Sequence, residues 1–447
     1  MYPKLWAAVW LLVLLALAAC EDTVAAANDT EASTGIEGSK GTGTGGAAAG
    51  PIIVGYYETW KNTAEDVDPK VFGDYTYINI AFGIPQADGS IQFPDGEDWM
   101  PDTISQMHEA GANVLVSLGG WTGSQYFSGI VADEAASETF ITNIVTMMKD
   151  KELDGIDIDW EYPGKEGAKC NTFDAAADSE NFLKFLQALR TAIDAEYPGE
   201  QAKIITAAVG VEPWYSNGQP MTDLSEYAEV VDFVHLMAYD IMGGFSETTG
   251  PNAPLLPDPN GSAISFSTAI DAWTGAKWPP EKMTAGLAFY GHSMTITGGS
   301  AEAPESQYQP KESTLPQGDQ DDATYAEPCD GTDGYSGQWQ WKNLRAQEVL
   351  TSPAEAAEPW IRTFDETTMT PWLYNGETKM YISYDDPESI QAKLDCAKEK
   401  GIAGVMVWAM SNDNGELIDV LTQWQGGGSA GGGGNPTGDP KGDDDTT

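Results

Sequence analysis

Three carboxyl side chains alternate with apolar ones in residues 153–163, which read Leu-Asp-Gly-Ile-Asp-Ile-Asp-Trp-Glu-Tyr-Pro. If this segment is a β-strand, Asp157, Asp159 and Glu161 share one face, because strand side chains alternate with a period of two. Desolvation and mutual repulsion both oppose the ionisation of carboxyls crowded on an inner strand face. Such a row indicates either chemistry with a shared proton or a metal site. The alternative is an exposed acidic edge strand, which the apolar opposite face disfavours.

The order of the three carboxyls along the strand suggests a role for each. Glu161 is the last of them and the nearest to the strand's end, so it is the predicted general acid. We expect Asp159 to raise the pKa of Glu161 by like-charge repulsion, as a proton donor at moderate pH requires. Asp157 lies deeper and is expected to share a proton with Asp159, so that the two titrate as a unit.

Eight short apolar segments alternate with helical patterns along the chain. Strands are expected at residues 52–57, 75–82, 113–118, 203–209, 231–239, 283–289 and 402–408, with the acidic segment as the fourth of eight. Helices are expected at residues 102–110, 140–149, 179–196, 269–273 and 387–400. This alternation predicts an α/β fold, a single (β/α)8 barrel with buried parallel strands. Active sites of such barrels lie at the C-terminal ends of the strands, where Glu161 falls.

The stretch between the seventh strand and its helix is too long to be a loop. We therefore expect an inserted α+β subdomain at residues 292–379, beside the C-terminal mouth of a barrel that spans residues 51–425. The Gly-, Ala- and Thr-rich residues 20–50 are predicted to be a disordered linker. The Gly- and Asp-rich residues 426–447 are predicted to be a disordered tail.

Aromatic residues follow the ends of several predicted strands. Tyr56 ends the first strand, Trp121 follows the third and Trp408 ends the eighth. Sugar rings stack their C–H faces on aromatic planes while polar groups hold their hydroxyls. Carboxyls surrounded by aromatic side chains therefore indicate a carbohydrate subsite.

The charge balance bears on the class of partner. The 447 residues include 69 acidic and 22 basic ones, for a formal net charge of −47. A polyanion of this size repels nucleic acid and anionic membrane surfaces. An uncharged polymer is a more suitable substrate.

The first residues predict export. Residues 1–19 place Lys4 before a short apolar run that ends in small residues, as in a secretory signal peptide. The protein is therefore expected to be secreted and extracellular. Alternatively, the run Leu-Ala-Ala-Cys at residues 17–20 has the shape of a bacterial lipoprotein cleavage box, which would leave the protein lipid-anchored through Cys20.

Three cysteines follow the signal region. Cys170 and Cys329 both lie in polar, loop-like sequence and could pair outside the cell. Cys396 lies on the apolar side of a helical pattern and is expected to be a buried free thiol.

Four motifs in chain order resemble those of the family 18 glycoside hydrolases, the chitinases. They are SLGG at residues 117–120, DGIDIDWE at 154–161, MAYD at 237–240 and Trp408. Residues 290–291 and 381–386 resemble the flanks of the family's insertion domain, and the segment from Glu161 to Cys170-Asn171 resembles fungal secreted members. The resemblance covers about residues 52–424. The chain departs from the pattern at His292, where many relatives have arginine.

The resemblance implies hydrolysis of β-1,4-linked N-acetylglucosamine polymers with help from the substrate, an exception to the usual two-carboxylate scheme. Glu161 would protonate the glycosidic oxygen while the substrate's acetamido carbonyl attacks the anomeric carbon, giving an oxazolinium ion. Asp159 would turn from Asp157 to hold the acetamido N–H. Tyr239 would hydrogen-bond the acetamido oxygen and is grouped with these three catalytic residues.

The resemblance also implies a substrate-binding set around the reacting sugar. Asp240 would bind the distorted sugar, Trp408 would form the floor of the site and Trp121 would stack on a neighbouring sugar. The whole set is Tyr56, Phe82, Trp121, Tyr162, Met237, Asp240 and Trp408. Three of these, Tyr56, Phe82 and Met237, could instead simply fill the barrel.

No cofactor and no metal ion are expected, because the carboxyls already have roles and the three histidines form no cluster. The expected partner is chitin or chitooligosaccharides, with no nucleic acid and no protein partner, and the chain is expected to be a monomer. Two other functions stay open. One is an endo-β-N-acetylglucosaminidase acting on glycoprotein glycans, and the other is a non-catalytic chitin-binding lectin.

Overall fold

The computed structural model describes residues 50–426, except residues 62, 64, 65, 96, 299–301, 327, 328, 330 and 332. The predicted signal peptide, Cys20 and most of both terminal segments lie outside these residues. Among the described helices, none is long and apolar enough to cross a membrane.

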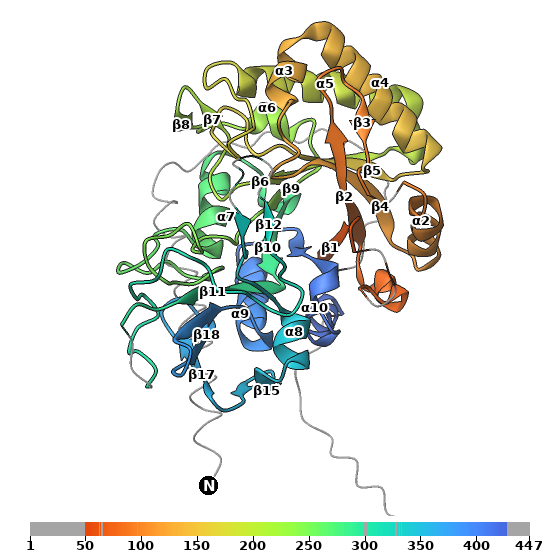
Figure 1. Ribbon diagram of the computed structural model, residues 1–447. Coiled ribbons are helices and arrows are strands. Elements are labelled where there is room, and N and C mark those ends of the chain that lie inside the picture. The colour runs from red at the N-terminus through yellow and green to blue at the C-terminus, as the bar shows by residue number, and fades with distance from the viewer. Residues whose placement is uncertain are drawn as a thin grey trace, which may run out of the picture.

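A closed barrel of eight parallel strands forms the centre of the molecule (Figure 1). The strands are β1 (Ile52–Glu58), β2 (Tyr77–Pro85), β4 (Asn113–Gly119), β5 (Gly155–Asp159), β6 (Ile204–Val209), β9 (Phe233–Leu236), β10 (Met283–Ala288) and β20 (Gly404–Trp408). Their order is β1-β20-β10-β9-β6-β5-β4-β2, and pairing of β1 with β2 closes the ring. The (β/α)8 prediction is confirmed, and the acidic segment is the fourth barrel strand.

Helices surround this barrel, as the alternation predicted. Those at the expected places are α2 (Met100–Glu109), α4 (Glu134–Asp150), α5 (Asp178–Glu196), α7 (Phe266–Gly275) and α9 (Pro387–Glu399). Those without a sequence prediction are α3 (Phe127–Ala132), α6 (Ser225–Ala228), α8 (Trp341–Ala346) and α10 (Glu416–Gln425). Three of the four are six residues or shorter, and periodicity is weak over such lengths.

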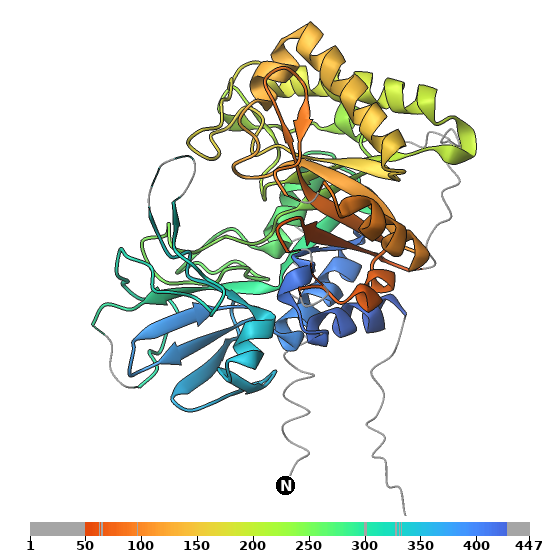
Figure 2. The ribbon, with the colours of Figure 1, turned by 45° about the vertical axis from the view of Figure 1, so that its right-hand side comes forward.

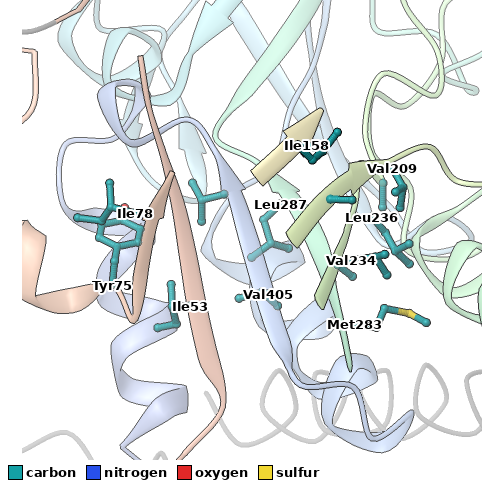
Figure 3. Close-up of a cluster of buried hydrophobic side chains, with 14 of the residues drawn as sticks. Ile53, Tyr75, Ile78, Ile158, Val209, Val234, Leu236, Met283, Leu287 and Val405 are labelled. Carbon is teal, nitrogen blue, oxygen red and sulfur yellow. The ribbon is translucent and has the colours of Figure 1, made fainter. Parts of the chain in front are cut away.

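The core between strands and helices is built from the outward-facing strand residues. Figure 3 shows aliphatic side chains from several strands in this layer, among them Ile53, Ile158 and Val405. On the acidic strand, Ile156 and Ile158 are at most 1% exposed. Trp160, just beyond it, stacks on Phe127 at 5.4 Å between ring centroids. This apolar outer face orients the strand, so that its carboxyls face the barrel interior.

Two predicted strand ends differ from the structure. Strand β5 ends at Asp159, so that Glu161 lies in the loop that follows. Strand β9 ends at Leu236, and Asp240 takes a left-handed backbone conformation with φ of 53°. In both places the chain leaves the sheet to turn over the barrel mouth, which a period-two pattern does not reveal.

A second sheet lies beside the barrel (Figure 2). It has five antiparallel strands in the order β14-β11-β19-β18-β17. They are β11 (Tyr290–Thr295), β14 (Gln338–Gln340), β17 (Trp360–Asp365), β18 (Thr370–Asn375) and β19 (Met380–Ser383). The same part of the chain forms two separate short hairpins. One pairs β12 (Tyr325–Ala326) with β13 (Asp333–Gly334), and the other pairs β15 (Leu350–Ser352) with β16 (Glu355–Ala356). The expected α+β insertion between the seventh strand and its helix is confirmed.

Cysteine pairing adds a covalent link between the two parts. Cys170, in the loop between β5 and α5, forms a disulfide with Cys329, between β12 and β13. Their Cα atoms are 4.8 Å apart. Cys396 is buried in α9 as expected, but it is disulfide-bonded, so the prediction of a free thiol is wrong.

Two consecutive aspartates join the insertion sheet to the barrel helix α9. Asp386 caps α9 by accepting hydrogen bonds from the backbone N–H groups of residues 388 and 389, and it also pairs with Arg362 of β17. Asp385 pairs with Lys393 of α9 at 2.5 Å, where both side chains are at most 1% exposed. The junction therefore depends on a desolvated ion pair.

Replacing Lys393 with alanine is expected to lower the free energy of unfolding by about 3–5 kcal/mol, because Asp385 then keeps a buried charge without its cation. Urea denaturation followed by tryptophan fluorescence measures the change. The matched control is Lys398→Ala, on the exposed side of the same helix, which should cost less than about 0.5 kcal/mol. Equal losses from the two variants would contradict the role of the buried pair.

Candidate active site

A cavity of about 440 Å³ opens at the C-terminal ends of the barrel strands. Nine of the residues predicted for the site line it: Tyr56, Phe82, Trp121, Asp159, Glu161, Met237, Tyr239, Asp240 and Trp408. Two predicted residues do not line it. Asp157 lies beneath with no exposed surface, and Tyr162 is half-buried behind Glu161 and hydrogen-bonds to its carboxyl.

Asp157 is held from three sides by hydroxyl groups. Tyr56 donates to its Oδ2 at 2.8 Å and Ser117 donates to the same oxygen at 2.7 Å. Thr206 donates to Oδ1 at 2.6 Å. The three donors come from β1, β4 and β6. Asp157 thus serves as an acceptor on both oxygens. Within the described residues it makes no hydrogen bond to Asp159, so the proton shared by the two stays a prediction.

Asp159 is buried among like charges. Its side chain is 4% exposed, and within the described residues its Oδ1 has no hydrogen-bond partner. Burial, then the charges of Glu161 and Asp157, raise the pKa of Asp159 well above its usual value. Its backbone carbonyl accepts hydrogen bonds from the N–H of Gly120 and the hydroxyl of Ser124. Asp159 therefore holds a proton more readily than an exposed aspartate does, and two hydrogen bonds fix its backbone carbonyl.

Glu161 is a carboxyl that can donate a proton near neutrality. It is 8% exposed and lines the cavity. Burial raises its pKa to about 7, the charge of Asp240 adds to this, and the hydrogen bond from Tyr162 acts against it. The sequence-based expectation named repulsion from Asp159 as the cause. In the structure the causes that raise this pKa are burial first and then the charge of Asp240.

Asp240 keeps its charge at the wall of the cavity. Its Oδ1 accepts a hydrogen bond from the Tyr290 hydroxyl at 2.7 Å and lies 2.7 Å from Nε2 of His292. Desolvation alone would raise the pKa of Asp240, but these two partners outweigh it and lower the pKa. His292, the departure from the family pattern, therefore acts on the cleft through Asp240. Both partners lie on β11, the first strand of the insertion sheet.

Aromatic rings form a continuous floor. Trp408 stacks on Phe82 with centroids 5.8 Å apart, and Phe82 stacks on Trp60 at 6.3 Å. Trp60 is 49% exposed and lines the cavity, but it was missed from the sequence because it belongs to none of the motifs. The available signal was its position two residues after the end of β1, at the mouth of the barrel where the other site residues lie.

Trp121 stands at the rim, 49% exposed. Asn171 donates its side-chain N–H groups to the backbone carbonyls of Trp121 at 2.8 Å and of Glu161 at 3.1 Å. The side-chain amide of Asn171 therefore fixes the backbone of Trp121 relative to that of Glu161. Asn171 follows Cys170, so the disulfide also restrains this loop.

Tyr239 presents its ring to the cavity with 8% exposed surface. Its hydroxyl lies 3.6 Å from the sulfur of Met406, a weak acceptor, so it can still bind a ligand oxygen. In the described part of the chain, no three His, Cys, Asp or Glu side chains are grouped to hold a metal ion.

The family model of the glycosyl hydrolases family 18 matches residues 52–413. The chain belongs to this family. A chitinase-like effector from Moniliophthora roreri is 33% identical over 392 residues, 84% of this chain and 92% of the relative. Chitinase 1 of Aphanocladium album is 27% identical over 444 residues, 92% of each chain.

Solved structures agree with this assignment. A crystal structure of a chitinase from Rhizomucor miehei shares 32% sequence identity, with a TM-score of 0.74, over 83% of this chain and 99% of that one. Family 18 membership and the chitinases among the relatives support glycoside hydrolysis as the class of reaction.

The Tyr162→Phe variant is expected to raise the pKa of Glu161 above about 7, since the lost hydrogen bond favours the charged carboxylate. A rise of about 0.5–1 unit is reasonable for one hydrogen bond to a charged group. Carboxyl-carbon NMR titration of glutamate-labelled protein measures it, with the Glu161→Gln spectrum assigning the resonance. The control is Tyr215→Phe, whose hydroxyl bonds Glu212 instead. An unchanged or lower pKa in Tyr162→Phe would contradict this account.

Proposed function

We propose that the protein is a chitinase, which hydrolyses β-1,4-linked N-acetylglucosamine polymers with the help of the substrate's own acetamido group. One observation carries the proposal. Glu161, whose pKa burial raises to about 7, faces a cavity floored by Trp408 and Phe82. A proton donor above a stacked aromatic floor suits a sugar chain.

The first step breaks the glycosidic bond. Glu161 gives its proton to the glycosidic oxygen as the bond from that oxygen to the anomeric carbon breaks. The acetamido carbonyl oxygen forms a bond to the same carbon, giving an oxazolinium ion and a carboxylate on Glu161. Asp159 accepts a hydrogen bond from the acetamido N–H, for which its unpartnered Oδ1 is available among the described residues. Tyr239 donates to the acetamido oxygen.

The second step restores the enzyme. The Glu161 carboxylate takes a proton from water, and the resulting hydroxide attacks the anomeric carbon from the side that the leaving group vacated. The oxazolinium ring opens and restores the acetamido group, and the sugar keeps its β configuration. Glu161 is then protonated again and ready for another cycle.

The charged Asp240 would bind a sugar hydroxyl. Among the described residues, both hydrogen bonds to its side chain go to Oδ1, so Oδ2 can accept one from the substrate. Its negative charge also stabilises the positive charge that develops at the anomeric carbon. The floor that extends through Phe82 to Trp60 favours a linear chain with several stacked sugars.

Two other functions compete with this proposal. A chitin-binding lectin on this scaffold is one, and the relative from Moniliophthora roreri is named chitinase-like rather than chitinase. The presence of Glu161 in a protonatable state favours catalysis. An endo-β-N-acetylglucosaminidase is the other, and the long aromatic floor favours linear chitin over a branched glycan.

The Glu161→Gln variant is expected to lose at least about 10³-fold in turnover of chitooligosaccharides, because the amide cannot donate the proton. Its affinity for the same oligosaccharides, measured by calorimetry, should stay within a few-fold of the wild type. Glu166→Gln, exposed on the same loop, serves as the control and should retain activity. Substantial hydrolysis by Glu161→Gln would remove the general-acid assignment.

Hydrolysis assays of the wild-type protein on two substrates distinguish the three functions. The protein should release short oligosaccharides from chitin and nothing from a high-mannose glycoprotein. Binding of chitin without release from either substrate would favour the lectin. Release from the glycoprotein alone would favour the endo-β-N-acetylglucosaminidase.

A further inference from the structure

A layer of polar side chains lies inside the barrel, beneath the catalytic carboxyls. Its members come from six strands, and each is at most 1% exposed: Asn79, Ser117, Asp157, Thr206, His235 and Thr284. The interior of such barrels is usually filled with branched apolar residues. Burying polar groups is costly unless they are paired. Asp157 and its hydroxyl donors lie directly beneath Asp159 and Glu161, whereas the proposed reaction gives no role to His235 and Thr284.

His235 is placed between two of these groups. On one side its Nδ1 lies 2.7 Å from the hydroxyl oxygen of Thr284. On the other its Nε2 lies 3.9 Å from Oδ1 of Asp157. The edge of its ring contacts Tyr56, with centroids 6.4 Å apart. Register pairing places Thr284 and Ala208 beside His235 on the neighbouring strands.

The charged and titratable groups around His235 are therefore few. Asp157 faces it from β5, the Tyr56 ring from β1 and the Thr284 hydroxyl from β10. Strand β6 contributes Ala208, while the hydroxyl of Thr206 is directed to Asp157. Burial lowers the pKa of His235 and the charge of Asp157 opposes this only in part, so the ring is neutral.

The hydrogen-bonding pattern selects one tautomer. A neutral imidazole has one N–H donor and one acceptor nitrogen. Asp157 already accepts three hydroxyl hydrogen bonds and offers only acceptor oxygens to the ring. The Thr284 hydroxyl can donate, so it donates to Nδ1, and the proton of the ring is on Nε2. The distance of 3.9 Å is too long for a direct hydrogen bond, but the N–H dipole acts on Asp157 across a low-dielectric interior.

We propose that His235 is a positioning residue of the hydrolysis: its Nε2–H, fixed by Thr284, favours Asp157 as an acceptor and so keeps the proton of the Asp157–Asp159 pair on Asp159. The inference rests on the proposed function, because the proton concerned belongs to the carboxyls beside Glu161. Without the imidazole, Asp157 takes the proton more readily and Asp159 becomes charged. Repulsion from Asp159 then raises the pKa of Glu161 above about 7.

The test is the pH profile of chitooligosaccharide hydrolysis by a His235→Leu variant. Its alkaline limb, which follows deprotonation of Glu161, is expected to move upward by about one pH unit. Thr284→Val, which removes the hydroxyl that fixes the tautomer, should move the limb in the same direction by less. Thr284→Ser keeps a hydroxyl and should restore the wild-type profile. His108→Leu is the matched control, since His108 pairs with Asp154 outside the barrel interior.

Two outcomes would overturn the inference. One is a His235→Leu variant whose kcat falls equally at every pH with no movement of the alkaline limb, as a packing role predicts. The other is an equal effect of Thr284→Val and Thr284→Ser. Thermal unfolding shows whether His235→Leu is folded. If it is not, the two Thr284 variants decide the question.

Failure of the proposed function is distinguishable from failure of this inference. A wild-type protein that binds chitooligosaccharides but hydrolyses none at any pH defeats the chitinase proposal alone. The carboxyl-carbon NMR titration of Glu161 then replaces the pH profile. A higher pKa of Glu161 in His235→Leu than in the wild type supports the inference, and an equal or lower one overturns it.

Discussion

A carboxylate without exposed surface must be satisfied by the groups around it, and Asp157 imposes this requirement on the whole barrel. Its three hydroxyl donors come from β1, β4 and β6, separated from it by 101, 40 and 49 residues. They converge only when the strands close in the correct register. A slip of one residue in any of these strands would turn its hydroxyl to the outer face. The interaction that holds Asp157 beneath Asp159 and Glu161 thus also specifies the closed barrel.

The carboxyls above Asp157 differ in protonation because their surroundings differ. Asp159 is buried between like charges, and its pKa is raised well above the usual value. Glu161 is buried at the mouth, with a pKa of about 7. Asp240 receives two hydrogen bonds at the wall, and its pKa is lowered. Three carboxyls with raised, near-neutral and lowered pKa values therefore stand around one cavity, as separate acid and base roles require.

The insertion sheet contributes to this electrostatic arrangement and not only to the depth of the cleft. Tyr290 and His292, which hold Asp240, lie on its first strand, directly after β10. The desolvated pair of Asp385 with Lys393 ties its last strand to α9. Displacing this sheet would free Asp240 and so alter the charge that acts on Glu161. The fold of the insertion and the acidity of Glu161 are therefore coupled.

Local patterns in the sequence determined the eight strands, most of the helices, the insertion and the acidic row, because side-chain periodicity and motif spacing are properties of neighbouring residues. The tertiary structure alone decided which groups surround the carboxyls. It assigned three hydroxyls to Asp157, burial and Asp240 as the causes of the raised pKa of Glu161, and a place in the floor to Trp60. Desolvation and convergence of distant side chains arise only when the barrel closes, and no local pattern encodes them.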